Sequence, residues 1–346
     1  MAKIAVLGYG TVGSGTVEVF YKNKESLEKK AGQEMDIKYI LDIRDFSDSP
    51  YKDKFVKDFN VILNDPEVTV VAEVIGGLKP AYDFVKSSLE AGKSVVAAKG
   101  AELLAIAKEK NVNFFFEASV GGGIPIIKPL HACLSANEID EIAGILNGTT
   151  NFILTKMIRD GMDFEKALKI AQELGYAERN PSADVDGHDA CRKICILASL
   201  AFGKHVYPDS VHTEGITKIT LEDVAYCDSA DAKIKLIGCA KREEAGKISI
   251  GVFPAVIKDE SQLAGVNDVF NAILVRGDAT GDVVFYGKGA GKLPTASAVV
   301  ADIVSAVKHS GTSKSLTWSD SAQDFIKDFS EFSCANYIRL SSKNVE

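Results

Sequence analysis

One segment of the chain gathers ionisable side chains whose spacing suits proton transfer. It spans residues 180–193 (NPSADVDGHDACRK), just where an apolar run begins. If a helix begins near Gly187, then Asp189 and Lys193 are four residues apart and share one helix face. A carboxylate beside an ammonium holds the lysine in place and tunes its pKa, which suits proton transfer to a carbonyl or an alkoxide.

The same two residues also fit a simpler interpretation, an ordinary surface ion pair. For an isolated Asp–Lys pair at this spacing that role is the more common one. Here Asp184 and Glu178 precede the pair, and a nucleotide-binding motif occurs elsewhere in the chain. We therefore interpret the segment as part of an active site, with Lys193 and Asp189 as the candidate catalytic residues.

The nucleotide-binding motif is GxGxxG near the N-terminus (GYGTVG, residues 8–13). A strand pattern at residues 3–7 precedes it and a helical pattern follows, which is the context that gives the motif its meaning. Gly8 permits a tight turn, Gly10 lets the backbone approach a pyrophosphate, and Gly13 allows the helix to pack closely on the strand. The pyrophosphate would lie at the positive end of the helix. The candidate cofactor-binding residues of the motif are Gly8, Gly10, Thr11, Val12 and Gly13.

The end of the second predicted strand, residues 37–43, bears on the choice of dinucleotide. An acidic residue there would bind the ribose 2′-hydroxyl of NAD, whereas an arginine would bind the 2′-phosphate of NADP. Asp42, Arg44 and Asp45 are all present. Both cofactors therefore fit the pattern, and Arg44 favours NADP.

Alternating strand and helix patterns continue to residue 116 and predict a doubly wound parallel sheet of the Rossmann type. The expected strands are residues 69–75, 94–97 and 113–116, and the expected helices are residues 80–91 and 102–110. Ligands of such sheets bind beyond the carboxyl ends of the strands. Gly8, Ile75, Gly76 and the Glu117–Ala118 junction are therefore expected to line one crevice.

Three further glycine-containing segments each fit a structural or a functional role. The run EASVGGGIPII (residues 117–127) is either a connector between domains or a carbonyl cage for a cation or a platform for nicotinamide. In LNGTTNF (residues 146–152), Thr150 or Asn151 could cap the next helix, or these groups, with Gly148 and Thr149, face a substrate. In GKGAGKLPTA (residues 287–296), the loop meets a phosphate or the nicotinamide end, or is a tight connection.

The second half of the chain predicts an α+β domain with a mostly antiparallel sheet. A strand is expected at residues 139–145 and a helix at residues 164–174, and alternating patterns follow at residues 248–255, 271–275 and 282–286. The apolar helix expected at residues 295–309 would return to the first domain. The expected domains are residues 1–128 for the nucleotide, 129–286 for substrate and dimerisation, 287–312 as the return segment, and 313–346 as a linker.

Composition excludes several classes of protein. The formal net charge of −8 argues against a nucleic-acid partner, because phosphate neutralisation needs a basic face. Apolar runs are shorter than a membrane span, and residues 1–10 enter a strand without a signal-peptide pattern. The six cysteines form no CxxC, so reduced thiols and a cytoplasmic location are expected.

With these segments in order, the chain resembles homoserine dehydrogenase. The resemblance runs from residue 3 to about residue 309, and the set of segments GYGTVG, EASVGGGIPII, LNGTTNF, GYAERNPSADVDGHDACRK and GKGAGKLPTASAV is highly specific. It implies NAD(P)H-dependent interconversion of L-aspartate 4-semialdehyde and L-homoserine in threonine and methionine (hence isoleucine) biosynthesis. It also implies a Rossmann domain and a homodimer formed by the substrate domain.

The resemblance also assigns roles to particular residues. Lys193 corresponds to the acid/base, Asp189 orients it and contacts substrate, Asp184 lies in the same pocket, and Glu178 receives the substrate ammonium. Gly148 and Thr149 are further substrate-side candidates. Gly289 and Gly291 match the loop that closes over the cofactor. A sodium site is implied at Glu117 and the carbonyls of Val120, Gly122 and Ile124.

Two segments depart from the family pattern. After residues 94–96 the family has a Thr/Ser-Asn-Lys loop, whereas AAKGAE follows here, so the family's lysine is not transferred to Lys99. Residues 329–346 resemble a linker and a first strand, residues 337–340, of an amino-acid-binding regulatory domain of the ACT type. The alternatives to the dehydrogenase are another Rossmann amino-acid or sugar dehydrogenase and a nucleotide-sensing relative that has lost catalysis.

Overall fold

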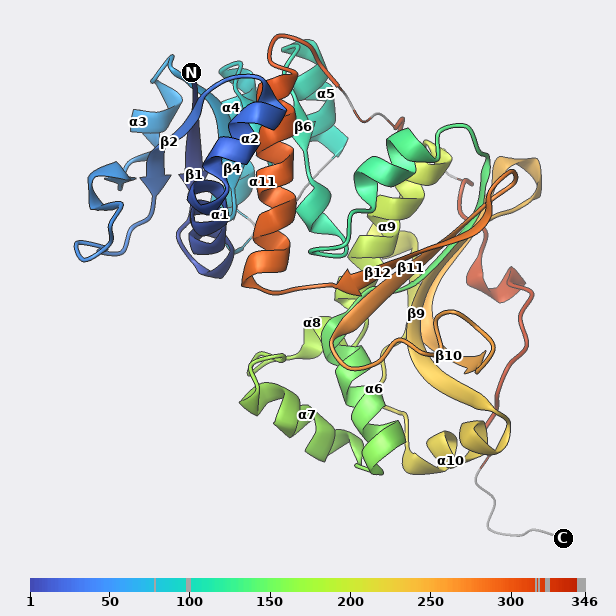
Figure 1. The fold of residues 1–346 in the computed structure, drawn as a ribbon. Helices are drawn as coiled ribbons and strands as arrows, with labels where there is room; N and C mark the ends of the chain where they lie inside the picture. The colour runs from blue at the N-terminus through green and yellow to red at the C-terminus, as the bar shows by residue number, and fades with distance from the viewer. Residues whose placement is uncertain (78, 98–100, 315, 317, 321–323, 341–346) are drawn as a thin grey trace, which may run out of the picture. The chain divides into compact units, whose positions relative to one another are not determined.

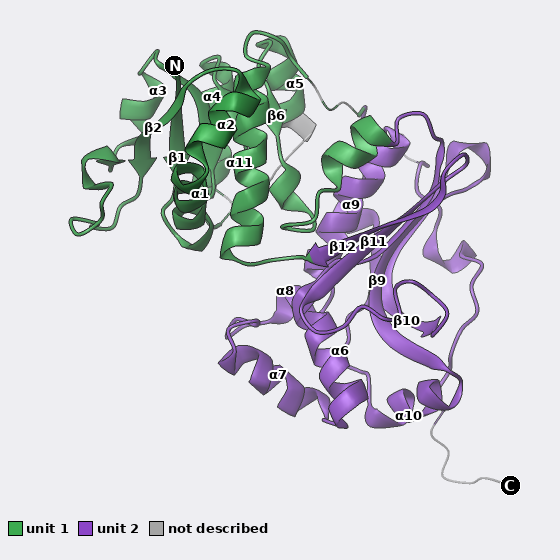
Figure 2. Ribbon diagram, in the orientation of Figure 1, with its two compact units in different colours: residues 1–133, 288–318 green, residues 134–287, 319–346 purple. Residues whose placement is uncertain are grey.

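The computed structural model describes residues 1–77, 79–97, 101–314, 316, 318–320 and 324–340 (Figure 1). These residues form two compact units (Figure 2). Unit 1 holds residues 1–133 and 288–318, and unit 2 holds residues 134–287 and the described part of 319–346. The chain thus returns to unit 1 at Lys288, and the described residues after Trp318 belong to unit 2.

Unit 1 is built on a parallel sheet, which confirms the predicted Rossmann-type fold. Its order among the described residues is β3-β2-β1-β4-β5-β6. The strands are β1 (Ala2–Leu7), β2 (Met35–Leu41), β3 (Phe55–Val56), β4 (Val68–Glu73), β5 (Ser94–Val96) and β6 (Phe114–Phe115). The register pairs Leu7 with both Leu41 and Glu73. The three central strands therefore end side by side, and the residues that follow them meet at one edge of the sheet.

The helices of unit 1 include one that arrives from the far end of the sequence. The described helices are α1 (Thr11–Lys22), α2 (Lys24–Ala31), α3 (Phe59–Leu63), α4 (Lys79–Glu90), α5 (Ala101–Glu109) and α11 (Lys292–Lys308). On α11, Val299, Val300 and Ile303 join the buried cluster that contains Ile4 and Phe20. Burial of such side chains contributes about 1.5–3 kcal/mol each. This packing fixes the glycine-rich loop before α11 on unit 1.

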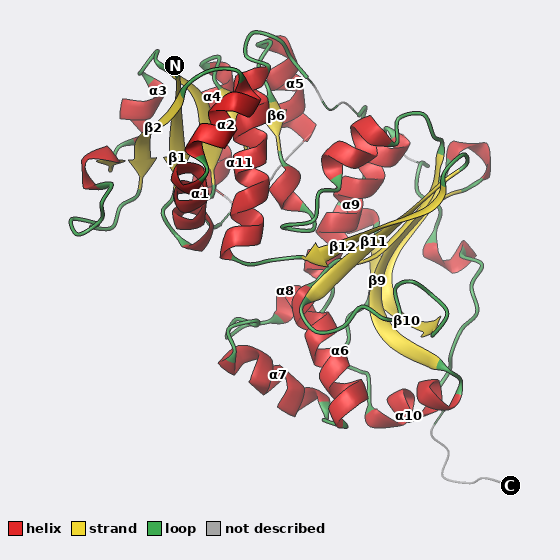
Figure 3. Ribbon diagram, in the orientation of Figure 1, coloured by secondary structure: helices red, strands yellow, loops and turns green. Residues whose placement is uncertain are grey.

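Unit 2 contains a mostly antiparallel sheet, as predicted. Its order is β12-β11-β7-β9-β10-β8 in the described residues, and only the short β8 is recorded as parallel to its neighbour β10. The strands are β7 (Ile139–Ile145), β8 (His212–Thr213), β9 (Ala232–Arg242), β10 (Ile248–Lys258), β11 (Phe270–Gly277) and β12 (Gly281–Lys288). Figure 3 shows these strands in yellow with helices beside them.

The helices described in unit 2 are α6 (Gly148–Asp160), α7 (Phe164–Glu173), α8 (Ser182–Val185), α9 (His188–Phe202) and α10 (Leu221–Ser229). Helix α9 lies close against β9. A Cβ atom at Gly238 would meet Leu146 Cδ1 at 2.9 Å and Ile194 Cβ at 3.2 Å. The glycine on β9 therefore permits the close approach of α9, which carries Asp189 and Lys193.

The prediction of a strand at residues 337–340 is wrong, because the structure has these residues in an irregular segment. Tyr337 instead stacks on Tyr226 of α10, with ring centroids 4.9 Å apart, and its hydroxyl donates to Asp223 at 2.9 Å. Arg339 donates to the same carboxylate at 2.6 Å. The aromatic and ionic contacts with α10 replace strand pairing.

Within the described ranges, no helix is long and apolar enough to cross a membrane.

Candidate active site

Helix α9 begins where the sequence places it and brings its acid and base together. Its N-cap is Gly187, at φ 85°, and a Cβ atom there would meet Thr213 Cγ2 at 3.1 Å. The left-handed backbone and the close neighbour both favour glycine. Asp189 lies in the first turn, where the helix dipole stabilises a negative charge. Lys193 Nζ lies 2.6 Å from Asp189 Oδ2.

Asn147 links this pair to a second carboxylate. Its amide nitrogen donates to Asp184 Oδ1 at 2.7 Å and to Asp189 Oδ2 at 3.0 Å. Its amide oxygen accepts the backbone N–H of Thr150 at 2.9 Å and caps α6. Lys193 Nζ also donates to the carbonyl oxygen of Leu146 at 3.1 Å. The end of β7, the start of α6, α8 and α9 thus converge on one polar cluster.

The two carboxylates of the cluster have opposite pKa shifts. Burial raises the pKa of Asp189, but the charge of Lys193 and hydrogen bonds from Lys193 and Asn147 outweigh it and hold the pKa below its usual range. Burial raises the pKa of Asp184, and the charge of Asp189 adds to the increase. Asp189 therefore stays ionised as the partner of Lys193. Asp184 gains from a cation that would compensate its charge.

Sequence reasoning missed Asn147 and misplaced the helix cap. Thr150 and Asn151, the expected caps, lie inside α6. The Thr150 hydroxyl bonds to Asn147, and the Asn151 amide donates to the carbonyls of Val266, Asp268 and Phe270. The cap preference of asparagine just before α6 was the available signal. Its contacts with Asp184 and Asp189 depend on long-range folding.

The other substrate-side candidates lie at different depths. The Thr149 hydroxyl donates to the carbonyl of Tyr176 at 2.6 Å, which ties the start of α6 to the segment before Glu178. A Cβ atom at Gly148 would meet the carbonyl oxygen of Val269 at 2.9 Å. Glu178 is exposed, and its backbone carbonyl accepts a hydrogen bond from Gln172. Thr149 therefore adjoins the cluster, whereas no described contact brings the Glu178 carboxylate into it.

In unit 1 the glycine motif forms a turn that fits a pyrophosphate. Gly8 is at φ 97°, and a Cβ atom at Gly13 would lie 1.9 Å from the carbonyl oxygen of Gly8. A Cβ atom at Gly10 would meet nothing within 4 Å, so space remains at the N-cap of α1. Thr11 and Val12 begin the helix, where backbone N–H groups point outward. Such a cradle suits a dinucleotide phosphate.

The acidic and basic residues after β2 form one unit. Arg44 donates to both carboxylate oxygens of Asp42, at 3.0 and 2.8 Å. The backbone N–H of Tyr9, inside the glycine motif, donates to Asp42 Oδ2 at 2.8 Å. Hydrogen bonds from Arg44 hold the pKa of Asp42 well below its usual range. Arg44 is thereby directed toward the glycine turn.

The other expected cofactor-binding residues lie in the same unit, after β4 and before α11. Ile75 and Gly76 follow β4, and the Ile75 N–H donates to Glu73 at 2.7 Å. Gly291, at φ 116°, caps α11. A Cβ atom at Gly15 of α1 would meet the Lys292 carbonyl oxygen at 2.9 Å, so the starts of α1 and α11 pack closely. Gly289 is buried in the loop before α11.

The glycine run after β6 contains the four residues expected to bind sodium. The Glu117 carboxylate accepts the backbone N–H groups of Ile126, Ile127 and Lys128 at 2.6–2.8 Å. These three donors hold the Glu117 carboxylate at the start of the loop that carries the carbonyls of Val120, Gly122 and Ile124. Lys99 lies outside the described residues.

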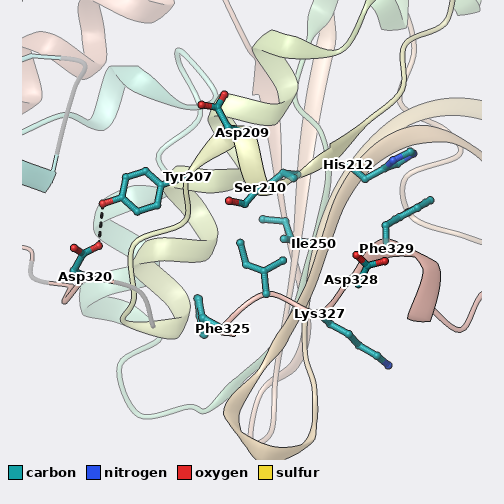
Figure 4. A pocket seen from close by; sticks show the side chains of 12 residues that line it. Tyr207, Asp209, Ser210, His212, Ile250, Asp320, Phe325, Lys327, Asp328 and Phe329 are labelled. Atoms are coloured by element: carbon teal, nitrogen blue, oxygen red, sulfur yellow. Dashed lines mark hydrogen bonds between the residues drawn. The ribbon is translucent and has the colours of Figure 1, made fainter. Parts of the chain in front are cut away.

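A pocket of about 720 Å³ in unit 2 is lined by different side chains. Figure 4 shows Tyr207 with its hydroxyl directed at Asp320, 2.9 Å away, Phe325 below them and Phe329 on the opposite side of the view. The residues described as lining it include none of the Asn147–Asp184–Asp189–Lys193 cluster. Volume alone therefore does not mark the candidate active site.

Comparisons with known proteins cover most of the chain. A family model described as "Homoserine dehydrogenase" matches residues 125–304, and one described as "Homoserine dehydrogenase, NAD binding domain" matches residues 8–117. The curated homoserine dehydrogenase of Bacillus subtilis is 42% identical over 319 residues, which are 89% of this chain and 73% of that protein. That of Pseudomonas aeruginosa is 44% identical over 318 residues, covering 88% and 72%.

Solved structures give the same relationship. A homoserine dehydrogenase from Thiobacillus denitrificans matches with a TM-score of 0.85 and 42% identity, over 88% of this chain and 73% of that one. A hyperthermophilic archaeal homoserine dehydrogenase in complex with NADPH matches with a TM-score of 0.74 and 28% identity, over 88% and 97%. Both sequence and fold therefore relate the two units to this family.

Proposed function

The chain belongs to the homoserine dehydrogenase family, an NAD(P)-dependent group of oxidoreductases that act on a CH–OH group, and on this premise we propose that Lys193 is its proton donor and acceptor. The reaction is the interconversion of L-aspartate 4-semialdehyde and L-homoserine. The observation that carries the proposal is the Lys193 ammonium, held between Asp189 and the Leu146 carbonyl.

Lys193 acts on the oxygen atom that changes charge. The dinucleotide supplies the hydride. As the aldehyde carbon is reduced, negative charge grows on its oxygen, and a positioned ammonium stabilises that charge and donates a proton. In the opposite direction the neutral amine accepts the hydroxyl proton. Asp189 and the Leu146 carbonyl orient Nζ, and Asn147 fixes Asp189.

Asp184 is the proposed partner of the substrate ammonium group. Its half-buried carboxylate receives a hydrogen bond from Asn147 at 2.7 Å, and burial raises its pKa, which supports a role for a cation beside it. A substrate ammonium would supply the missing cation. Glu178 and Thr149 are proposed to complete this subsite, and Gly148 to keep it open.

We propose NADP as the preferred dinucleotide. The glycine cradle of residues 8–13 binds the pyrophosphate, and Arg44 receives the 2′-phosphate. Ile75 and Gly76 border the nicotinamide half, and Gly289 and Gly291 close over it. A carboxylate at this position normally selects NAD, but here both Asp42 oxygens already accept hydrogen bonds from Arg44.

A sodium ion is proposed at the main-chain carbonyls of Glu117, Val120, Gly122 and Ile124. Left-handed backbone at Gly121 (φ 73°) and Gly122 (φ 52°) turns successive carbonyls of this short loop. Neutral carbonyl oxygens suit a hard monovalent cation. The ion would stabilise the loop and take no part in proton transfer.

A homodimer is proposed through one face of the sheet of unit 2. Ala143 pairs with both Cys239 and Leu274, so these side chains share that face. Partly buried Phe270 and Val284 extend it, and Tyr286, 58% exposed, stacks on Phe270. A half-exposed apolar sheet face is typical of an interface between identical subunits. Sedimentation velocity of the wild type and of Val284→Glu tests it.

The reaction is tested by NADPH oxidation on addition of aspartate semialdehyde, with sodium present. We expect turnover, and higher kcat/KM with NADPH than with NADH. Dinucleotide binding without turnover would contradict the proposal and would indicate a nucleotide-sensing relative.

A further inference from the structure

Two buried carboxylates and one lysine of unit 1 join three segments that are distant in the sequence. Asp302 of α11 is fully buried and lies 2.6 Å from Lys128 Nζ through Oδ1. Its Oδ2 accepts the backbone N–H of Glu117 at 2.8 Å. The Glu117 carboxylate in turn accepts the backbone N–H of Lys128 at 2.8 Å. The end of β6, the segment at residues 126–128 and α11 are thereby fixed to one another.

The loop enclosed by these contacts is the glycine run, residues 117–124. Its far side rests on the segment that precedes α11. A Cβ atom at Gly122 would lie 2.4 Å from the carbonyl oxygen of Gly289, and the Gly123 N–H donates to the Lys288 carbonyl at 3.0 Å. The loop is therefore held at its base by ionic contacts and at its glycines by backbone contacts. A shift at the base would move the carbonyls of Val120 and Gly122.

In this cluster Lys128 supplies the positive charge that compensates the buried Asp302 carboxylate. Its ammonium lies 2.6 Å from Oδ1 of Asp302, whose side chain is fully buried. The Lys128 ammonium also donates to the Ser305 hydroxyl at 2.9 Å and lies 5.4 Å from the Phe115 ring centroid. Loss of the lysine would leave a buried carboxylate unpaired, which is strongly unfavourable. The loop would then adjust to a displaced Asp302.

We propose that Asp302 and Lys128 are positioning residues that act through Glu117 to hold residues 117–124 in the conformation that binds the dinucleotide and the monovalent cation. The proposal rests on the proposed function, which assigns both ligands to this part of unit 1. Neither residue touches the reacting atoms. Their effect is expected in ligand affinity and not in the rate of the chemical step.

The test compares four variants of the full chain. Asp302→Asn keeps an oxygen for the Glu117 N–H but removes the ion pair, Lys128→Met removes the ammonium, and Lys128→Arg restores a cation. Lys54→Met is the matched control. Lys54 forms an ion pair with Asp36 (3.0 Å) in the same unit, and its side chain is about as exposed as that of Lys128. This pair lies at the opposite end of the sheet, near β2 and β3. The NADPH Kd is measured by fluorescence titration, without substrate, over a series of sodium concentrations.

We expect Lys128→Met and Asp302→Asn to raise the NADPH Kd, or the sodium concentration at which binding is half-maximal, by about tenfold. Other residues that orient ligands indirectly have effects of this size. Lys128→Arg should recover most of the affinity, and Lys54→Met should match the wild type. Wild-type affinity and sodium dependence in Lys128→Met would overturn the inference, as would equal losses in the control.

The sodium response of the wild type separates this inference from the proposed function. If the wild-type NADPH Kd does not change with the sodium concentration, the proposed cation site is wrong. The NADPH Kd of the variants then still tests the positioning role. If Asp302→Asn fails to fold, the comparison of Lys128→Met with Lys128→Arg decides it. Failure of arginine to restore affinity would contradict the ion-pair basis.

Discussion

Two lysine–aspartate pairs in this chain have the same N–O distance, 2.6 Å, and different surroundings. In the pair of Lys128 and Asp302, the carboxylate side chain is fully buried and its second oxygen holds a backbone N–H. In the pair of Lys193 and Asp189, both side chains are partly exposed, at 18% and 25%. The groups around Lys193 and Asp189 are side chains and the main-chain carbonyl of Leu146, which come from the ends of four elements.

The contrast shows that distance alone does not indicate what an ion pair does. Asp302 binds the backbone N–H of Glu117 and the Lys128 ammonium, so its pair is tied to the position of the loop that begins at Glu117. Asp189 and Asn147 orient Lys193 through side chains, and water or substrate can reach the ammonium. The two pairs differ in the burial of the carboxylate and not of the lysine, because the Lys128 side chain is 36% exposed and that of Lys193 is 18% exposed. The fully buried Asp302 acts as a brace, whereas the partly exposed Asp189 leaves its lysine free to transfer a proton.

The largest effect is expected for Lys193→Ala. Loss of the proton donor should lower kcat by about 10²–10⁴-fold, which is the usual contribution of general acid–base catalysis. NADPH affinity should stay unchanged. Steady-state kinetics with a dinucleotide titration measures both, and Arg192→Ala, an exposed neighbour on α9, is the control. Equal losses of turnover and NADPH affinity would contradict the assigned role.

A third lysine extends the comparison, because the hydrogen bonds described for it lead to neutral oxygens. Lys235 of β9 is fully buried and donates to the Val266 carbonyl at 2.5 Å and to the Asn151 amide oxygen at 3.2 Å. Burial lowers its pKa to about 8. The native state therefore binds this proton more weakly than the unfolded chain, whose lysines have a pKa of about 10.4.

The sign of the pH effect follows from this difference. At pH 8 and below, protonation of the buried Lys235 lowers the free energy of unfolding, and this loss becomes smaller as the pH rises toward 10. Relative to Lys235→Met, the wild type should gain about 2 kcal/mol of unfolding free energy between pH 8 and pH 10. Urea unfolding at several pH values measures it, with Lys233→Met on the same strand as control. A constant difference between wild type and Lys235→Met would refute the prediction.

Asp184 tests the proposed substrate subsite within the Lys193 cluster. Because burial raises its pKa, the carboxylate loses its charge at a higher pH than an ordinary aspartate. Substrate KM should therefore rise as the pH falls through this range. Asp184→Asn should raise KM by about tenfold, equivalent to one charged hydrogen bond. It should also flatten the dependence on pH. A pH profile that persists in the variant would point to another group.

The smallest effect is expected at the exposed pair of Asp42 and Arg44. The Arg44 side chain is 58% exposed, so solvent weakens its interactions. Arg44→Ala should weaken NADPH binding by about fivefold, or about 1 kcal/mol, and leave NADH binding nearly unchanged. Parallel titrations with the two dinucleotides measure the ratio. Equal changes for both would exclude a role in 2′-phosphate recognition.

Local signals made the starts of α1 and α9 predictable. The strand–GxGxxG–helix order and the glycine before His188 depend on neighbouring residues only, as does the spacing of Asp189 and Lys193. The sheet types also followed from alternation of strands and helices. Sequence reasoning failed where pairing is long-range. It missed that Asn147 meets Asp184 and Asp189, and that Lys128 meets Asp302.

Two other failures have particular physical causes. Strand β9 escaped prediction because Lys233 and Lys235 interrupt its apolar pattern, although Lys235 is fully buried among oxygen acceptors. The contacts of the Glu117 carboxylate, which holds three backbone N–H groups, were also not foreseen from the sequence. In each case a charged side chain finds its partners in the protein interior, and composition does not show this.

Single-turnover kinetics on two variants tests the contrast between the two pairs most directly. The decay of NADPH absorbance is followed after mixing enzyme, saturating NADPH and aspartate semialdehyde. We expect Lys193→Ala to slow hydride transfer by at least about 10²-fold with an unchanged NADPH Kd. Lys128→Met should raise the NADPH Kd and keep near-wild-type hydride transfer at saturation. A fast Lys193→Ala enzyme, or the same pattern in both variants, would contradict the distinction.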